Sequence, residues 1–395
     1  MVLRRIPKEI WVLVMAAFAI ALGYGLIAPI LPQFARSFDV GFAAAAAIVT
    51  VFALVRLAFA PGGGALVQRF GERRVYLVGL GIVAVSTGAV AFAQSYWQLL
   101  LFRGLGGVGS VMFTVSSMGL LARLSPPDIR GRTSSLYGSA FLLGNILGPS
   151  LGSAMHGLGY QLPFLLYAGA LGVATAIVAV FLSTEQLAAP TPDSKPTPTL
   201  SLREALGDSA YRALLASSFA NGWSNFGVRI ALLPLMAAAI PTLGAAWAGI
   251  ALTSFAVGNV VLQQLTGRLV DRRGRRPTVL TGLVFTGLVT FVFGWTTSLP
   301  VFLGLSVLAG MGTAFIAPAQ QATLSDVLGR ERRGGHAVAA VSMSGDLGSV
   351  AGSLVSGFVA DLLGFGWAFA LTGAVLFSAA LPWLRAREPM RGSRP

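Results

Sequence analysis

Four ionisable side chains lie deep inside long apolar stretches of this chain: Asp346, Arg56, Arg103 and Arg229. A charge near the centre of a membrane costs about 2.5–3.5 kcal/mol on insertion scales, so each of them needs a reason. Burial favours the protonated form of a carboxyl group and a nearby arginine favours its ionised form. A carboxylate held between these effects can bind and release a proton within one cycle. The sequence therefore predicts proton or substrate-charge binding at Asp346, with a structural pairing of this carboxylate as the alternative.

The three arginines predict an electropositive environment. A guanidinium does not release its proton, so Arg103 would act electrostatically, by holding an anion or by favouring the ionised form of a carboxylate. Apart from Glu9 at the edge of the first apolar stretch, the first six stretches contain no acidic residue to pair with it. This excess of cations favours an anionic, zwitterionic or lipid-like ligand. Alternatively, Arg56 and Arg229 snorkel toward the membrane surfaces, which is the interpretation we expect for Arg229.

Amide and aromatic side chains inside the same stretches could line a cavity for amphipathic molecules, because such cavities combine apolar walls with a few polar groups. Hydrogen bonding between helices is the alternative role for the amides. The candidate cavity residues are Tyr24, Arg56, Tyr137, Asn145, Asn221, Trp223, Asn225, Phe226, Gln320 and Gln321.

The composition places these residues in a membrane protein. The 395 residues are 55% hydrophobic and only 11% charged, far below the roughly 25% charge of soluble domains. Runs of about 20 apolar residues are long enough to cross a bilayer. Twelve spans are predicted, at 9–31, 42–67, 75–94, 97–123, 133–155, 161–183, 209–237, 244–267, 277–297, 299–325, 336–361 and 364–384.

The net charge of +14 reflects topology rather than binding to nucleic acid. Of the 28 Lys and Arg residues, 24 fall at the two termini or in the even-numbered loops. The positive-inside rule then places both termini in the cytoplasm. The absence of cysteine excludes disulfides and thiolate chemistry, and with only two histidines we expect no metal, cofactor or catalytic cluster. No phosphate-binding loop of the G-x-x-x-x-G-K-[ST] type occurs, which excludes ATP-driven transport by this chain.

The two halves of the chain repeat each other at an offset of about 203 residues. Gly64, Arg69 and Gly71 match Gly267, Arg272 and Gly274, in two basic loops of the same shape. A proline-containing segment lies between the halves. The sequence thus predicts an N-terminal six-helix bundle at 1–183, a cytoplasmic linker at 184–208 and a C-terminal six-helix bundle at 209–395.

A stripe of small residues runs along the fifth span, where Gly144, Gly148 and Gly152 recur every four residues and Pro149 interrupts the hydrogen bonding. Such stripes let helix backbones approach closely in lipid. Plain tight packing is one interpretation. The other is that the fifth span packs on the eleventh, with its glycines at 345, 348 and 352, at a moving seam between the bundles.

These motifs resemble the major facilitator superfamily, specifically its twelve-span drug:proton antiporter branch. Loop 8–9, with Gly267, Asp271, Arg272, Gly274 and Arg275, is similar to the loop signature of that superfamily; loop 2–3 departs from it at Gln68 and Glu72. The resemblance implies that both loops contribute to a cytoplasmic gate, weaker where Gln68 replaces an aspartate. It also implies proton coupling through Arg103, and export through the glycine signature of the fifth span. The gate candidates are Gly64, Gln68, Arg69, Gly71, Gly267, Asp271, Arg272, Gly274 and Arg275.

The resemblance implies an all-α membrane protein with 12 transmembrane helices in two pseudo-symmetric bundles, the major facilitator fold. The expected function is proton-coupled efflux of small amphipathic compounds by alternating access. The alternatives are an exporter or importer of a specific anionic, sugar, siderophore or lipid-like substrate and, more remotely, a membrane receptor or enzyme. We expect a multi-pass protein of a bacterial inner membrane that works as a monomer, with small molecules, protons and membrane lipids as partners.

Overall fold

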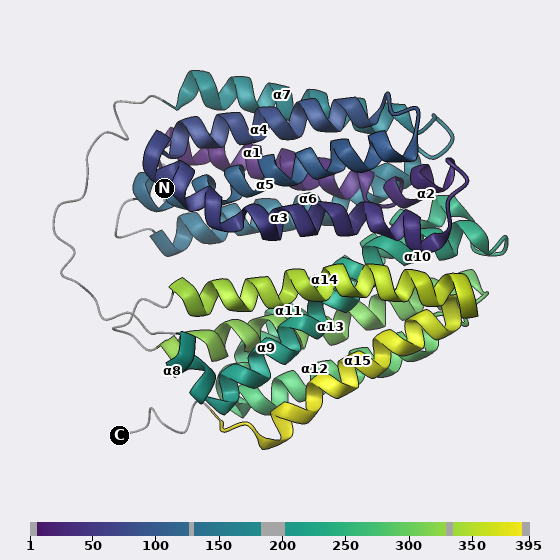
Figure 1. Cartoon of the computed structure of the whole chain (residues 1–395). Coiled ribbons are helices and arrows are strands. Elements are labelled where there is room, and N and C mark those ends of the chain that lie inside the picture. Colours follow the sequence, from purple (N-terminus) through teal and green to yellow (C-terminus); the bar gives the residue numbers. More distant parts are fainter. Residues whose placement is uncertain (1–5, 126–129, 183–201, 329–334, 389–395) are drawn as a thin grey trace, which may run out of the picture. The chain divides into compact units, whose positions relative to one another are not determined.

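The computed structural model describes residues 6–125, 130–182, 202–328 and 335–388, and within these ranges it contains helices and no strands (Figure 1). By their contacts, the residues form two compact units. The first comprises Met1–Val40 with Val51–Thr191, and the second Gly41–Thr50 with Pro192–Pro395. The prediction of an all-α membrane protein is confirmed. Figure 1 shows the long helices of each unit running alongside one another.

The described residues of the first half of the chain form seven helices. They are α1 (Lys8–Ile27), α2 (Leu31–Arg36), α3 (Phe42–Phe70), α4 (Glu72–Val90), α5 (Tyr96–Leu124), α6 (Arg130–Ala154) and α7 (Gln161–Phe181). Pro29 interrupts the helix shortly after the end of α1, because a proline has no amide N–H to donate to the carbonyl of the preceding turn. Gly71, with φ of 80°, separates α3 from α4 in a backbone conformation that glycine tolerates. The hydroxyl of Ser95 caps α5 by accepting from the amide of Gln98.

The second half follows the same plan with one irregular helix. Its elements are α8 (Leu202–Gly207), α9 (Ser209–Asn221), the π-helix η3 (Gly222–Arg229), α10 (Ile230–Ala239), the 3-10 turn η4 (Ala245–Trp247), α11 (Ala248–Arg273), α12 (Arg275–Phe293), α13 (Leu299–Leu328), α14 (Gly335–Leu363) and α15 (Phe365–Arg385). Gly274, with φ of 105°, separates α11 from α12 as Gly71 separates α3 from α4. The prolines of the expected linker lie outside the described residues, and its end forms α8.

Ten helices among the described residues are long and apolar enough to cross a membrane. The two remaining predicted spans also form helices. The fifth span is α6, whose Gly and Ser content lowers its hydropathy, and the seventh is the continuous α9–η3–α10, which the π-helix divides into shorter pieces. Predicted and observed span ends agree within a few residues, so the twelve-span architecture is confirmed.

The glycine stripe of α6 packs on α1 within the first unit. A Cβ on Gly144 would lie 2.6 Å from the backbone nitrogen of Leu22, and Gly148 and Gly152 meet the carbonyls of Leu22 and Leu26 just as tightly. The matching glycines of α14, Gly348 and Gly352, meet Phe219 and Trp223 instead. The stripe glycines of each span therefore meet helices of their own unit, which agrees with the interpretation of plain tight packing; a moving seam between the fifth and eleventh spans stays a prediction. A stripe of small residues shows that some backbone lies close, but not which one.

The repeat extends to individual backbone contacts. Gly107 of α5 lies against the carbonyl oxygen of Phe52 in α3, and Gly310 of α13 lies against the carbonyl oxygen of Phe255 in α11. Both pairs stand at the 203-residue offset. Because neither glycine has a side chain, the backbone of α5 can lie close to that of α3, and the backbone of α13 close to that of α11. These contacts fix the two phenylalanines that carry the candidate site.

The first turn of α3 is capped by a carboxylate within the second unit. Oδ1 of Asp361, on α14, accepts from the amide of Phe42 at 2.7 Å, and Oδ2 accepts from the amide of Ala43 at 2.9 Å. The rings of Phe42 and Phe365 lie 4.8 Å apart beside this cap. A carboxylate at a helix N-terminus satisfies free amides and matches the positive end of the helix dipole.

Candidate transport site and cytoplasmic loops

In the first unit, Arg103 of α5 is buried, with 6% of its surface exposed. Its Cζ lies 4.3 Å from the centre of the Phe52 ring, and its Nε is buried without a hydrogen-bond partner. The phenol groups of Tyr24 and Tyr167 lie within electrostatic range of the guanidinium. The site thus holds a cation against an aromatic face, in a bundle whose spans lack a central carboxylate. Its predicted part in proton coupling stays a prediction.

The same phenylalanine is shared by a second arginine. Arg56, one turn along α3, has its Cζ 5.9 Å from the Phe52 ring centre and donates from Nη1 to the hydroxyl of Ser110 at 3.1 Å. The ring of Tyr24 lies 6.3 Å from that of Phe52. Phe52 therefore brings together three of the residues that the sequence singled out: Tyr24, Arg56 and Arg103. Phe52 itself was not among the site candidates, although its position on α3 four residues before Arg56 could have identified it.

The other cavity candidates of this unit lie on α6. The hydroxyl of Tyr137 makes a side-chain hydrogen bond with Ser117 of α5. Asn145 donates from Nδ2 to the carbonyl of Phe141, one turn earlier on its own helix, at 2.9 Å. These local bonds account for both polar groups without a ligand, so the placement of Tyr137 and Asn145 in a substrate cavity stays a prediction.

In the second unit, the π-helix η3 contains the candidate residues of the seventh span. The amide of Asn225 donates to Oδ1 of Asn221 at 2.6 Å, and Nε of Arg229 reaches Oδ1 of Asn225 at 3.4 Å. Trp223 is buried and donates from Nε1 to Thr372 at 3.3 Å, whereas Phe226 is 56% exposed. Amides and guanidinium thus form one chain along the helix, with an aromatic on either side.

Arg229 does not snorkel. Its side chain is only 4% exposed, and its Cζ lies 4.0 Å from the centre of the Phe255 ring of α11. Its Nη1 is buried and has no hydrogen-bond partner among the described residues. The expectation that this arginine extends to the membrane surface is wrong, because the packing of η3 turns the side chain toward α11 rather than along the helix.

The remaining candidates of the second unit lie on α13 and α14. Gln320 is buried and donates from Nε2 to the hydroxyl of Ser217 on α9 at 2.9 Å, while Gln321 is exposed. Asp346 is half-buried on α14, one residue from Gly345, whose carbonyl is pressed against Gly222 of η3. Asp346 also makes an interaction of its own. A proton-binding role for this carboxylate stays a prediction.

The two basic loops end helices in the same way. Gly71 and Gly274 hold the left-handed φ values given above, and the neighbouring side chains of Arg69 and Arg272 are exposed. Gly64 has open space around it. Three of the gate candidates, Gln68, Gly267 and Asp271, lie outside the residues whose side chains the structure describes. The gate itself stays a prediction.

Each loop also anchors an ion pair, and the two pairs have reversed charges. In the first unit, Glu72 bonds Nε of Arg123 at 3.0 Å; in the second, Nε of Arg275 bonds Asp326 at 2.9 Å. At the 203-residue offset, Glu72 matches Arg275 and Arg123 matches Asp326. The departure of loop 2–3 from the loop signature at Glu72 is therefore compensated by the opposite charge at the end of α5. The repeat alone would have revealed this pair.

The segment after α15 docks on two helix starts. The carboxylate of Glu388 accepts from the amides of Arg275 and Arg276, at 2.8 and 3.1 Å, and so caps α12. Arg387 binds the carboxylate of Asp208, which caps α9 through the amide of Ala210. This hydrogen bond raises the pKa of Arg387 above its ordinary value.

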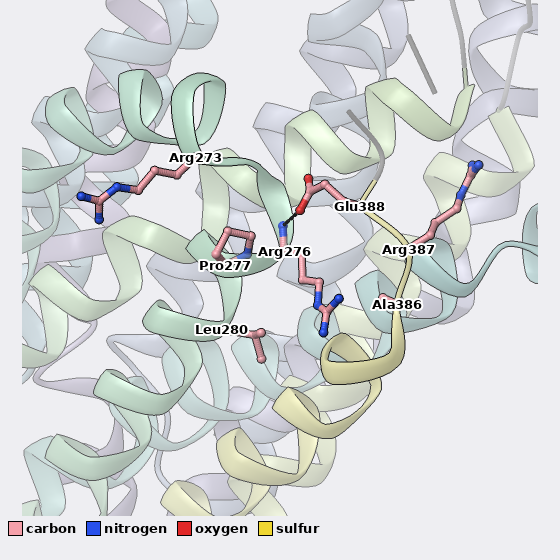
Figure 2. A pocket seen from close by; sticks show the side chains of 7 residues that line it. All are labelled: Arg273, Arg276, Pro277, Leu280, Ala386, Arg387 and Glu388. Carbon is pink, nitrogen blue, oxygen red and sulfur yellow. Dashed lines mark hydrogen bonds between the residues drawn. The ribbon is translucent and has the colours of Figure 1, made fainter. Parts of the chain in front are cut away.

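These contacts border an open pocket of about 810 Å³ (Figure 2). Figure 2 shows Glu388 reaching the start of α12 at Arg276, while the side chains of Arg273 and Arg387 extend away from it. The pocket is lined by Arg273, Arg276, Pro277, Leu280, Ala386, Arg387 and Glu388. None of these residues was a site candidate, although Arg273 and Arg276 belong to loop 8–9. Nothing in the sequence linked the C-terminal segment to this loop.

The architecture and its buried charges are those of a polytopic transporter. The profile of the Major Facilitator Superfamily matches residues 13–245 and 214–395, which together span nearly the whole chain. The chain belongs to this superfamily.

Two relatives of the chain are drug-resistance proteins. The chain is 30% identical to the class G tetracycline resistance protein of Vibrio anguillarum over 391 residues, 92% of this chain and 94% of that protein. It is 31% identical to the quinolone resistance protein NorA of Staphylococcus aureus over 175 residues, 44% of this chain. That second match spans only 45% of NorA. These similarities place the chain with the drug:proton antiporter branch.

Solved structures share the fold at low sequence identity. A bacterial homologue of the human lysosomal transporter Spinster, inward-facing and unoccupied, has a TM-score of 0.81 at 14% identity, covering 95% of this chain and 96% of that one. The human organic anion transporter MFSD10 has a TM-score of 0.69 at 18% identity, covering 95% of this chain and 100% of that one. These structures show that the chain has the major facilitator fold, in agreement with the family match.

Proposed function

We propose that this protein exports small amphipathic compounds in exchange for protons, by alternating access of an N-terminal bundle (1–183) and a C-terminal bundle (209–395) joined by a cytoplasmic linker. It would act as a monomer in a bacterial inner membrane, with both termini in the cytoplasm. The observation that carries the proposal is the full-length similarity to a tetracycline resistance protein, together with a carboxylate deep in a transmembrane helix.

The proton would be bound by Asp346, and Arg103 would influence the carboxylate or the bound substrate through its charge. Support for this division comes from the asymmetry of the repeats: Arg103 corresponds to Ser306, so the charge occurs in one half only. Transporters built from repeats bind substrate and coupling ion near the middle of the membrane, where the halves contribute different groups. The glycine signature of α6 supports export by its resemblance to exporters.

The test is substrate-driven proton movement in proteoliposomes. The purified protein is reconstituted with a pH-sensitive dye inside the vesicles, and tetracycline or norfloxacin is added under an imposed proton gradient. We expect wild-type protein to move protons when substrate is added, and Asp346→Asn to bind substrate without moving protons. The matched control is Asp39→Asn, which removes an exposed carboxylate whose left-handed φ of 57° asparagine tolerates.

The proposal fails if wild-type vesicles show no substrate-dependent proton flux with either compound. Normal coupling in a folded Asp346→Asn protein would instead leave the transport function in place and restrict Asp346 to a structural role. The unfolding temperature of each variant separates loss of function from loss of fold.

A further inference from the structure

The seventh span contains an unusual backbone. Eight residues, Gly222–Arg229, form the π-helix η3 between α9 and α10. Its two glycines allow it to press on α14: a Cβ on Gly222 would strike the carbonyl of Gly345, and one on Gly227 would lie 2.7 Å from the carbonyl of Ser349. π-Turns within a helix are rare and often occur at functional sites, because they redirect side chains and free backbone groups.

The side chain at the end of η3 is a buried cation with unused donors. A guanidinium has five N–H groups. The hydrogen bond described for Arg229 uses Nε, which reaches Asn225 at the long distance of 3.4 Å, and the buried Nη1 has no partner. The large majority of buried side-chain polar atoms in native proteins have a hydrogen-bond partner, so an unsatisfied guanidinium nitrogen needs an explanation.

The surroundings hold this guanidinium in place without neutralising it. Phe255 covers its face at 4.0 Å, and Asn225, itself fixed by Asn221, contacts one edge. An aromatic ring on the face leaves the other in-plane N–H groups directed outward, and this fork matches the two oxygens of a carboxylate. A guanidinium held in this way can bind a carboxylate through two parallel hydrogen bonds.

Comparison with the first unit shows that this cation is not inherited from the repeat. Phe52 and Phe255 are equivalent, and each carries an arginine on its ring. The cation nearest to the Phe52 ring, Arg103, comes from α5, and Arg56 of α3 lies farther from the same ring. The cation over Phe255 comes from η3. At the 203-residue offset Arg229 corresponds to Leu26, which is apolar. The two halves thus have equivalent phenylalanines, and the arginine closest to each ring comes from a different helix.

We propose that Arg229, held by Phe255 and Asn225, binds the carboxylate or a similar anionic group of the transported compound. This inference rests on the proposed function and specifies its substrate class: amphipathic molecules that carry an anionic group, including zwitterions. It assigns a substrate contact to Arg229 that is separate from the coupling pair Arg103 and Asp346.

The experiment compares two probes that differ only in this group: norfloxacin, a quinolone carboxylic acid, and its ethyl ester. Binding of each to the full-length protein in lipid nanodiscs is measured by equilibrium dialysis. We expect wild-type protein to bind the acid at least tenfold more tightly than the ester. In Arg229→Gln the acid should lose this advantage while the affinity for the ester is unchanged. The matched control, Arg36→Gln, removes one exposed arginine and should leave both affinities unchanged.

A second variant guards against misfolding of Arg229→Gln. Asn225→Asp places a carboxylate beside the guanidinium, where it should compete with the acid. We expect this variant to remain folded, to lose affinity for the acid by about tenfold, and to bind the ester as wild type does.

The inference is overturned if wild-type protein binds the acid no more tightly than the ester or not at all, or if both variants retain the preference. Proton flux separates this outcome from failure of the proposed function. Proton-coupled transport of acid and ester alike would retain the function and reject the anion site. Acid binding that depends on Arg229 without any proton flux would retain the site and reject the antiport.

Discussion

The charge-reversed ion pairs allow a quantitative test of the repeat. In the first unit the side chain of Glu72 is 11% exposed and that of Arg123 is 48% exposed. Exposed pairs contribute about 0.2–1 kcal/mol, whereas a largely buried charge left without its partner costs about 1–3 kcal/mol. Arg123→Gln should therefore destabilise the protein by about 1–3 kcal/mol, because it strands the less exposed Glu72. Glu72→Gln should cost less, because the exposed Arg123 can turn to solvent.

The decisive variant exchanges the charges, so that the first unit adopts the order of the second. Glu72→Lys alone places two cations together, and Arg123→Glu alone places two anions together; each should lower the free energy of unfolding by about 1–3 kcal/mol. In the double variant the attraction returns, and we expect a coupling energy of about 1 kcal/mol or more. The free energies are measured by reversible unfolding in mixed SDS micelles.

The same cycle at Arg275 and Asp326 serves as the comparison. Their side chains are 13% and 31% exposed, and Arg275 also donates to the carbonyl of Val270 at 3.2 Å. The single variants at Arg275 and Asp326 should therefore lower the free energy of unfolding by more, and exchanging their charges should restore less of it. If the effects of the Glu72 and Arg123 single variants simply add in the double variant, the two side chains do not interact and the inferred compensation is refuted.

Three further changes test the packing and the caps. Gly148→Ala directs a methyl group at the backbone of Leu22 and should lower the free energy of unfolding in SDS by about 1–3 kcal/mol. Gly138→Ala, in open space on the same helix, should be neutral or stabilising. Equal effects of the two variants would contradict the packing of α6 on α1. Glu388→Gln removes the anionic cap of α12 and should speed hydrogen exchange of the first α12 amides, while unchanged exchange would reject the docking of the C-terminal segment. Tyr211→Phe removes a buried 2.8 Å hydrogen bond to a backbone carbonyl and should lower the free energy of unfolding by about 1 kcal/mol; no change would indicate that the hydroxyl is already hydrated.

Hydropathy and charge bias predicted the spans well, because a membrane-spanning helix must satisfy its backbone internally and present apolar side chains over a fixed length. The expected starts at 42, 161, 209 and 299 coincide with the first residues of α3, α7, α9 and α13. Glycines in the loops marked the helix ends, since a left-handed φ is available to few other residues.

The environment of Arg229 could not be predicted in this way. Depth along a span follows from counting residues, but the direction of a side chain depends on helix rotation. A π-helix changes that rotation within a few residues, and no residue pattern in Gly222–Arg229 predicts the π-helix. Helix partners have the same limitation, which is why the sequence did not identify α1 as the neighbour of Gly148.

The repeat relation resolves part of this limitation, because it separates what a duplicated fold requires from what was added later. Gly107 and Gly310 press on the carbonyls of Phe52 and Phe255 in both units, so the aromatic platforms follow from helix packing alone. The guanidiniums above them do not, since they come from α5 and α3 in the first unit and from η3 in the second. A fold hosts chemistry at sites placed upon it. The strongest candidates for transport chemistry are therefore side chains that differ between the two halves but lie on a phenylalanine that both halves share. Arg229 meets this criterion, because it matches Leu26 in the first half and lies on Phe255.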